Sequence, residues 1–315
     1  MDTTYAVLSE GLHKRFGDVH ALRGLELAVP VGSVCGVLGS NGAGKTTAVR
    51  VMTTLLAPDE GRVCVGGYDV VREGADVRRA IGVTGQQASL DEDLSGRENL
   101  RLFATLQRLR GSEGRRRADA LIEEFGLEDA AGRAVRTYSG GMRRRLDLAA
   151  SLIGRPEVLF LDEPTTGLDP ASRGQIWERV RALAAQGTTV LLTTQYLEEA
   201  DQLADDIVLI DHGRAAATGT PAELKSRIGS WAEAVVAEPA ALSGAAVVLA
   251  SLTGGEPVLD EERLAVGAVA VGPGLTLPRI VRELDAAGIP VVDAGLRPPT
   301  LDEVFLALTA KEPAV

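Results

Sequence analysis

Short apolar runs alternate with longer stretches of helical periodicity over the first two thirds of the chain. Residues 107–153 and 173–185 carry apolar positions three and four residues apart, which predicts helices. Three apolar runs bounded by turn residues predict buried strands: residues 33–38, 158–161 and 188–193. This alternation is typical of a mostly parallel sheet with crossover helices, so we predict an α/β fold.

The pattern changes after about Gly229. From there alanine and valine become frequent, and glycine and proline separate short alternating runs at residues 264–271 and 289–294. The string Thr300-Leu301-Asp302-Glu303 has the form of a capping box and predicts a last helix. We therefore predict two domains, residues 1–228 and a small α+β domain at residues 229–315.

Charge and hydropathy argue against several classes of protein. The 315 residues include 44 acidic and 33 basic side chains, and the formal net charge of −11 argues against a nucleic-acid partner. No run approaches the roughly 20 apolar residues of a membrane helix, so any action at a membrane requires a partner protein. The acidic, polar start predicts no secretory signal and a cytoplasmic chain. Arginine clusters at 115–117 and 143–145 are expected to be solvated or salt-bridged helix faces.

The strongest motif follows the predicted strand at 33–38. Gly39-Ser40-Asn41-Gly42-Ala43-Gly44-Lys45-Thr46 fits the phosphate-loop pattern GxxxxGK followed by Ser or Thr, and Thr47 comes next. Its glycines let backbone N–H groups turn inward around phosphates, and the helix N-terminus adds a positive dipole end. We expect Lys45 to reach the β- and γ-phosphates of ATP and Thr46 to ligate Mg²⁺. The alternative is a glycine-rich strand-to-helix turn.

The second motif is an acidic pair at a strand end. The apolar residues 158–161 lead to Asp162 and Glu163, at the end of a strand where ligands bind in α/β sheets. Asp162 is expected to hold Mg²⁺. Glu163, pointing the other way along the pleat, is expected to activate the attacking water as general base. Taken alone, the pair would serve equally well as a helix cap.

A Ser-Gly-Gly turn supplies a second anion site. Ser139, Gly140 and Gly141 open a helix, so exposed N–H groups and the helix dipole are expected to attract phosphate. Two anion sites in one chain favour a symmetric dimer, in which each chain's Ser139 turn closes on the other chain's nucleotide. An ordinary helix start is the alternative.

In this order, the motifs resemble those of an ABC-transporter ATP-binding domain over residues 5–228. The resemblance implies a RecA-like phosphate-loop core with a helical subdomain at about residues 88–155. It also implies ATP and Mg²⁺ as ligands and a homodimer of the ATP-binding domain.

The resemblance further implies roles for single residues outside the three motifs. Phe16 would stack on adenine, where a lone phenylalanine would otherwise be core. Gln86 would meet Mg²⁺ and the attacking water, with Gln87 as a rival one residue later. Asp169 would end a loop that crosses the dimer, or would simply cap the helix that follows.

Four stretches resemble more narrowly the daunorubicin-resistance group of exporter ATPases: residues 83–86, 138–145, 193–201 and 299–308. Three departures from the wider family's pattern stand out. Ser40 replaces a proline, and Tyr138 and Met142 replace leucine and glutamine, which predicts the loss of one hydrogen bond across the dimer. Gln195 stands where the family has a histidine that contacts the γ-phosphate; glutamine can position that group but cannot carry a proton.

The resemblance implies an ATP-hydrolysing subunit that powers export of an antibiotic-like or lipid-like small molecule. It would dock on a separate membrane-spanning permease at the cytoplasmic face of the cell membrane, near the acidic residues 91–93. One alternative is a soluble ATP-driven regulator or assembly factor without a transporter. Another is a nucleotide-binding module that no longer turns over, which the presence of Glu163 argues against.

Overall fold

The computed structural model describes residues 4–85, 89–227, 229–270 and 274–309, with side chains described up to residue 305. The chain divides into two compact units, Met1–Thr218 and Gly219–Val315. The boundary predicted at residue 228 therefore falls within the second unit. In the part of the chain that the structure describes, no helix has the length and apolar character of a membrane span.

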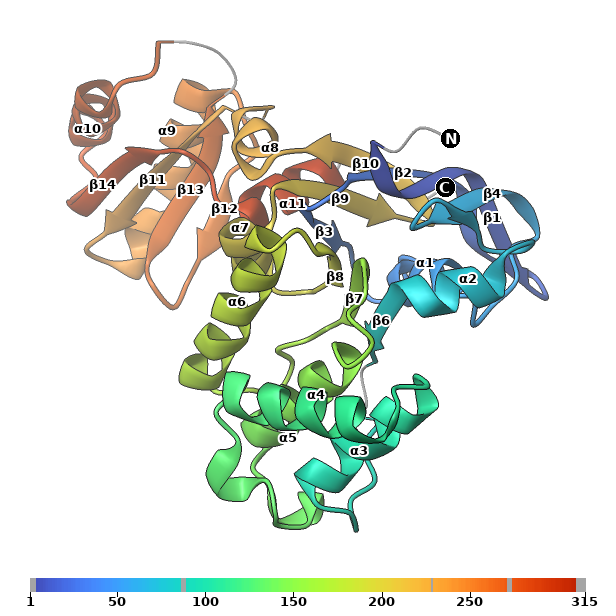
Figure 1. Ribbon diagram of the computed structural model, residues 1–315. Coiled ribbons are helices and arrows are strands. Elements are labelled where there is room, and N and C mark those ends of the chain that lie inside the picture. The colour runs from blue at the N-terminus through green and yellow to red at the C-terminus, as the bar shows by residue number, and fades with distance from the viewer. Residues whose placement is uncertain (1–3, 86–88, 228, 271–273, 310–315) are drawn as a thin grey trace. The chain divides into compact units, whose positions relative to one another are not determined.

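A six-stranded sheet forms the centre of the first unit, in the order β10-β9-β3-β8-β7-β6 (Figure 1). The five strands from β9 to β6 run parallel. The strands are β3 (Val34–Leu38), β6 (Ile81–Thr84), β7 (Val158–Asp162), β8 (Thr189–Thr193), β9 (Asp206–Asp211) and β10 (Arg214–Gly219). The three predicted strands are confirmed as β3, β7 and β8, and all their residues are buried.

Both faces of this sheet are covered, and β7 shows how the sequence achieves it. Leu159 and Leu161 join one core with the helical subdomain and with α6 (Pro170–Ala185). Val158 and Phe160, which alternate with them, join a second core with α1 (Lys45–Met52). Successive side chains of a strand point to opposite faces, so a continuous apolar run is what a strand buried on both sides requires.

A second, antiparallel sheet of the first unit corrects the expectation of one mostly parallel sheet. Its order is β2-β1-β4-β5, with β1 (Tyr5–Phe16), β2 (Val19–Pro30), β4 (Glu60–Val65) and β5 (Tyr68–Asp69), and α2 (Gly74–Ala80) follows. Only Gly17 and Asp18 separate β1 from β2. A two-residue turn forms a hairpin, whereas a parallel pair needs a crossover of a dozen or more residues.

The helical subdomain contains α3 (Gly96–Leu106), α4 (Gly111–Glu124), α5 (Gly140–Ser151) and two 3₁₀ turns, Glu128–Ala130 and Val135–Thr137 (Figure 1). Its core includes Leu100, Leu121, Phe125 and Leu146. After β8 the chain forms α7 (Leu197–Leu203). The helical pattern predicted for 107–153 is thus confirmed as two α-helices, with a mostly irregular stretch between them.

The second unit has the strand and helix order of a ferredoxin-like βαββαβ fold. The elements are β11 (Ser230–Val236), α9 (Leu242–Thr253), β12 (Val258–Asp260), β13 (Ala265–Ala270), α10 (Leu277–Ala286) and β14 (Val291–Arg297), with a 3₁₀ turn at Pro239–Ala241. The sheet is antiparallel, in the order β12-β13-β11-β14. Before it lies α8 (Pro221–Arg227) and after it α11 (Leu301–Thr309), whose capping box is confirmed by hydrogen bonds in both directions between Thr300 and Glu303.

Candidate active site

The described candidate residues that follow the parallel strands lie at their carboxyl ends. β3 leads into the phosphate loop, β8 leads to Gln195, and β7 ends at Asp162. Because β8 lies between β3 and β7 in the sheet, these three strand ends are neighbours. The carboxyl edge of a parallel sheet is where α/β proteins bind ligands.

The phosphate loop needs glycine at two positions for steric reasons. At Gly39 (φ +157°) a Cβ atom would lie 2.4 Å from the carbonyl oxygen of Ile210. At Gly44 (φ +112°) it would lie 2.7 Å from the carbonyl oxygen of Ala21. A side chain at either position would therefore push the loop away from the strands that support it.

Lys45 spans the loop from the first turn of α1. It is 6% exposed, and its Nζ donates to the carbonyl oxygens of Gly39 at 2.8 Å and Ser40 at 3.1 Å. Burial lowers the pKa of Lys45, while the carboxylates of Glu163 and Asp162 act in the opposite direction. A buried cation whose acceptors are two neutral carbonyls is well placed to exchange them for a phosphate, because charged acceptors give the stronger bonds.

The other residues of the phosphate loop differ in their exposure to solvent. Asn41 and Gly42 are exposed at the tip, whereas Ala43 is buried. Thr46 and Thr47 are half-buried in the first turn of α1. The hydroxyl of Thr46 thus belongs to the helix end that faces the carboxyl edge of the sheet.

Asp162 and Glu163 have different backbone conformations. Asp162 is 6% exposed and its Oδ1 accepts a hydrogen bond from Thr193 Oγ1 at 2.5 Å. Glu163 has φ +50°, its N–H donates to the Thr193 carbonyl at 3.0 Å, and its Oε2 accepts from Thr166 Oγ1 at 3.2 Å. The expectation that Glu163 continues the pleat of the strand is wrong, because β7 ends at Asp162 and Glu163 has a left-handed backbone; its predicted role as general base stays a prediction. Such a conformation costs free energy in a non-glycine residue and is often found at functional sites.

The Ser139 turn opens α5, as expected. Ser139 is exposed and its Oγ accepts from Met142 N–H at 3.2 Å. Gly140 is also exposed, whereas a Cβ at Gly141 would lie 2.6 Å from Ser172 Oγ. Ser172 in turn donates to Asp169 from its N–H at 3.0 Å and its Oγ at 2.7 Å. Asp169 therefore caps α6, and these hydrogen bonds lower its pKa.

Of the residues expected to contact adenine, the γ-phosphate and the attacking water, the structure describes some and leaves others out. Phe16 at the end of β1 is 48% exposed, with the Lys14 ammonium 5.7 Å from its ring centre, and Gln195 is exposed after β8. Gln86 and its rival Gln87 lie outside the described residues.

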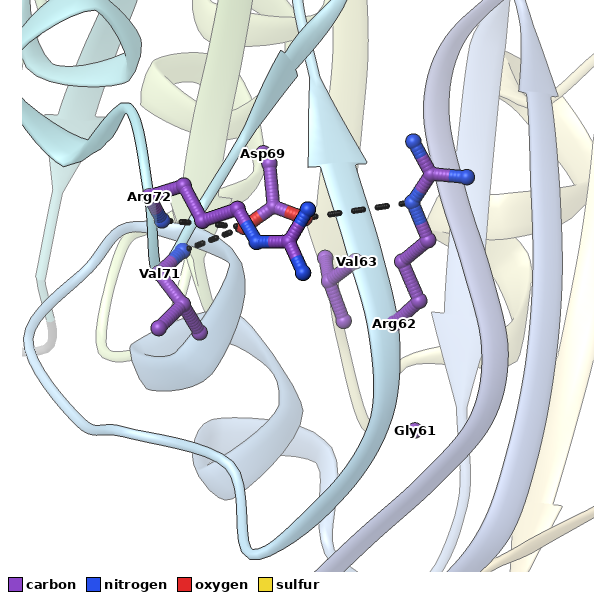
Figure 2. A pocket seen from close by; sticks show the side chains of 6 residues that line it. All are labelled: Gly61, Arg62, Val63, Asp69, Val71 and Arg72. Carbon is purple, nitrogen blue, oxygen red and sulfur yellow. Dashed lines mark hydrogen bonds and ion pairs between the residues drawn. The ribbon is translucent and has the colours of Figure 1, made fainter.

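Two of the pockets that described residues line lie on the first unit. One, of about 360 Å³, is lined by Gly140, Arg143, Arg144, Glu163, Thr166, Gly167 and Leu168. The other, of about 480 Å³, lies on the antiparallel sheet beside Asp69, and none of its lining residues was predicted to act in the site (Figure 2). There Asp69 accepts from the N–H groups of Val71 and Arg72 and lies 3.8 Å from Arg62, so its carboxylate is already engaged.

Comparison with known proteins decides the family. A family model described as "ABC transporter" matches residues 22–166. A daunorubicin resistance ATP-binding protein of Streptomyces coeruleorubidus is 56% identical, over 98% of this chain and 96% of that protein. The daunorubicin/doxorubicin resistance ATP-binding protein of Streptomyces peucetius is 50% identical, over 97% and 93%. The chain belongs to the daunorubicin-resistance family of ABC-transporter ATP-binding proteins.

Solved structures agree with this assignment to the ABC family. An ATP-binding cassette in a dimeric post-hydrolysis state with ADP and Pi has a TM-score of 0.62 and 25% identity, covering 68% of this chain and 98% of that one. An ATP-binding subunit of an ABC transporter has a TM-score of 0.65 and 28% identity, covering 70% and 92%. The predicted fold class is thus confirmed, and the chain is a nucleotide-binding ATPase subunit of an ABC transporter.

The prediction for one arginine cluster holds for its ion pairs, including that of Arg144 with Asp147 at 3.3 Å, but Arg144 is buried. The cluster 143–145 was expected to be a solvated or salt-bridged helix face, and Arg143 does pair with Glu92 at 3.1 Å. The side chain of Arg144, however, is only 11% exposed and donates to three main-chain carbonyls. Asp147 lies within one helical turn of both Arg143 and Arg144, so the sequence offered no signal that separates the two.

Proposed function

We propose that this subunit hydrolyses Mg²⁺-bound ATP with Glu163 as general base and so powers export of an antibiotic-like or lipid-like small molecule through a separate membrane permease. The observation that carries the proposal is the meeting of the phosphate loop with Asp162 and Glu163 at one edge of the sheet. The opposing effect of both carboxylates on the pKa of Lys45 supports this arrangement.

The residues present fit a nucleotide and its metal. At Gly39 and Gly44 the loop backbone packs directly on the carbonyl oxygens of Ile210 and Ala21, and the N–H groups of a loop that leads into a helix N-terminus bind phosphate. Asp162 and Thr46 supply the carboxylate and hydroxyl oxygens that Mg²⁺ takes beside nucleotide phosphates. When bound, Mg²⁺ neutralises part of the phosphate charge. Lys45 would then bind phosphate oxygens in place of its loop carbonyls, and Glu163 would accept the proton of the attacking water.

The names of relatives support the cargo class. Besides the two Streptomyces proteins, a doxorubicin resistance ATP-binding protein of Mycobacterium tuberculosis is 47% identical over 96% of this chain. A Nod factor export ATP-binding protein of Ralstonia nicotianae is 39% identical over 96% of this chain. We therefore place the subunit at the cytoplasmic face of the cell membrane, as a homodimer that receives the permease near residues 91–93.

The test of the base is Glu163→Gln, which keeps the shape of the side chain and removes its basicity. We expect kcat to fall by about 10²–10⁴-fold, because that is what loss of a general base costs. ATP binding should persist, and the trapped protein should run as a dimer in ATP and Mg²⁺. Glu198→Gln, at an exposed glutamate of α7, is the control. Undiminished steady-state hydrolysis would remove Glu163 from this role.

The test of the exporter is reconstitution with each membrane protein that the genes beside this chain's gene encode. ATP hydrolysis should rise when the permease is present in vesicles, and an anthracycline should accumulate inside inverted vesicles only with the active subunit. If none of the membrane proteins encoded beside this gene changes the rate of hydrolysis, the result would favour the soluble regulator instead.

A further inference from the structure

Arg144 connects the helix of the Ser139 turn to two strand ends. From α5 its Nε donates to the Pro164 carbonyl at 2.6 Å and its Nη2 to the Asp162 carbonyl at 3.2 Å. Its Nη1 donates to the Gly85 carbonyl at 2.9 Å, just beyond the end of β6. Arginine suits such a site because its planar fork presents five donors in fixed directions.

Two of these carbonyls, those of Asp162 and Pro164, belong to the residues on either side of Glu163. Glu163 has the left-handed φ of +50°, so its conformation must be held by its surroundings. Its own N–H donates to the Thr193 carbonyl on β8. Arg144 holds the carbonyls of Asp162 before it and Pro164 after it. The peptide unit between Asp162 and Glu163 is thus held by α5 through its carbonyl and by β8 through its N–H, and α5 also holds the chain one residue beyond Glu163, at the Pro164 carbonyl.

Asp147, one helical turn further along α5, forms an ion pair with the guanidinium of Arg144. Its side chain is 5% exposed, and its Oδ2 lies 3.3 Å from Arg144 Nη1. Its Oδ1 accepts from Ser89 N–H at 3.1 Å. A buried ion pair contributes little net stability, because desolvation offsets the attraction, so its presence favours a role other than stabilising the fold.

The neighbouring arginines provide a contrast within the same helix. Arg143 donates to Glu92 and to the Arg136 carbonyl. Arg145 donates to the carbonyls of Phe125 and Gly126. The described hydrogen bonds of both remain within the helical subdomain, whereas those of Arg144 reach the strand ends. Arg144 and Glu163 also line the same 360 Å³ pocket.

We propose that Arg144 is the positioning residue of Glu163. By holding the peptide unit before Glu163 and the Pro164 carbonyl after it, Arg144 makes the direction of the general base depend on the position of α5. The inference rests on the proposed role of Glu163. Since α5 begins at the Ser139 turn, an anion bound there would act on the same helix that carries Arg144. The phosphate contact at one end of α5 and the base are therefore coupled through one side chain.

The test is Arg144→Lys, with Arg145→Lys as the matched control. Lysine keeps the charge but cannot reach three carbonyls in fixed directions. We expect kcat to fall by about 10–100-fold, since small misplacements of a reacting group have effects of this size. The KM for ATP and the Kd of a fluorescent ATP analogue should stay within about twofold. Arg145→Lys should leave kcat unchanged.

Two further variants keep the test decisive. Arg144→Gln combined with Asp147→Asn removes both buried charges together, so the fold is not left with one unpaired ion, and it should reproduce the loss of kcat. Retention of kcat within about twofold by both Arg144 variants would overturn the inference, as would a rise in KM without a fall in kcat.

Combination with Glu163→Gln separates this inference from the proposed function. If Glu163→Gln leaves hydrolysis intact, the proposed function fails first. If it stops hydrolysis while Arg144→Lys does not slow it, only the positioning role fails. When both single changes slow hydrolysis, Arg144→Lys should add no further loss in the Glu163→Gln background. An equal loss in both backgrounds would show that Arg144 acts independently of the base.

Discussion

Asp147→Asn is expected to change how stability depends on pH. Burial raises the pKa of Asp147 from 3.8 to about 6, against the opposing effects of Arg144 and of the Ser89 N–H. The folded protein therefore holds this proton more tightly than the unfolded chain does. Where the folded state binds more protons, stability falls as the pH rises. The contribution of Asp147 is thus most favourable below about pH 4 and is lost as the pH rises through about 6.

The size of the effect follows from that shift. A change from 3.8 to about 6 corresponds to ~3 kcal/mol over the whole titration. Between pH 5.0 and 7.5, the accessible part of that range, the expected loss is about 1.4 kcal/mol. Asparagine does not titrate, so the free energy of unfolding of the native protein minus that of Asp147→Asn should fall by this amount between the two pH values.

Urea unfolding followed by circular dichroism at several pH values measures this difference. Asp119→Asn is the control, because Asp119 is 50% exposed in a surface ion pair with Arg97. Taking the difference between variants cancels the titration of all other groups. A difference in unfolding free energy that stays constant from pH 5.0 to 7.5 would show that burial does not raise the pKa of Asp147. A difference that grows with pH would show that Arg144 lowers this pKa by more than burial raises it.

Two other predictions concern the nucleotide directly. Lys45→Ala should abolish ATP binding, whereas Ser139→Ala should keep binding and slow hydrolysis, and a heterodimer of the two should retain at most one intact site. Loss of ATP affinity in monomeric Ser139→Ala would contradict the model in which each turn serves the other chain. Because Gln195 is neutral, the pH–rate profile should lack a limb near about 6.5, and Gln195→His should introduce one. Gln195→Ala should lower turnover moderately, and a limb already present in the native profile would place Gln195 away from the γ-phosphate.

The parts of the fold that could be predicted are those encoded by local pattern. The wholly buried strands β3, β7 and β8 are continuous apolar runs, and the phosphate loop joins β3 to a helix within eight residues of sequence. Parallel strands then bring Asp162 to the same edge as Lys45 without any further information. Such strands can be recognised from the sequence because both faces of the sheet are buried, so that the strands are continuous apolar runs.

What could not be predicted depends on contacts between distant segments. The left-handed Glu163 donates its N–H to Thr193, 30 residues away in sequence, and the carbonyls of Asp162 and Pro164 beside it accept from Arg144, 19 residues from Glu163. Nothing in the triplet 143–145 distinguishes its middle arginine, because burial is decided by where the strand ends lie. The antiparallel pairing of β1 with β4 likewise joins segments about 50 residues apart.

Tyr138 shows how a departure from the family's pattern can be explained by packing. Its side chain is 5% exposed, its hydroxyl donates to the Ala130 carbonyl at 2.7 Å, and burial raises its pKa. A Cβ at Gly96 would lie 2.3 Å from that hydroxyl oxygen, so the tyrosine fits only because the first residue of α3 is glycine. The ring thus packs behind the Ser139 turn, inside the helical subdomain. Tyrosine in place of leucine therefore changes the support of the turn and leaves the N–H groups of Gly140 and Gly141 available to an anion.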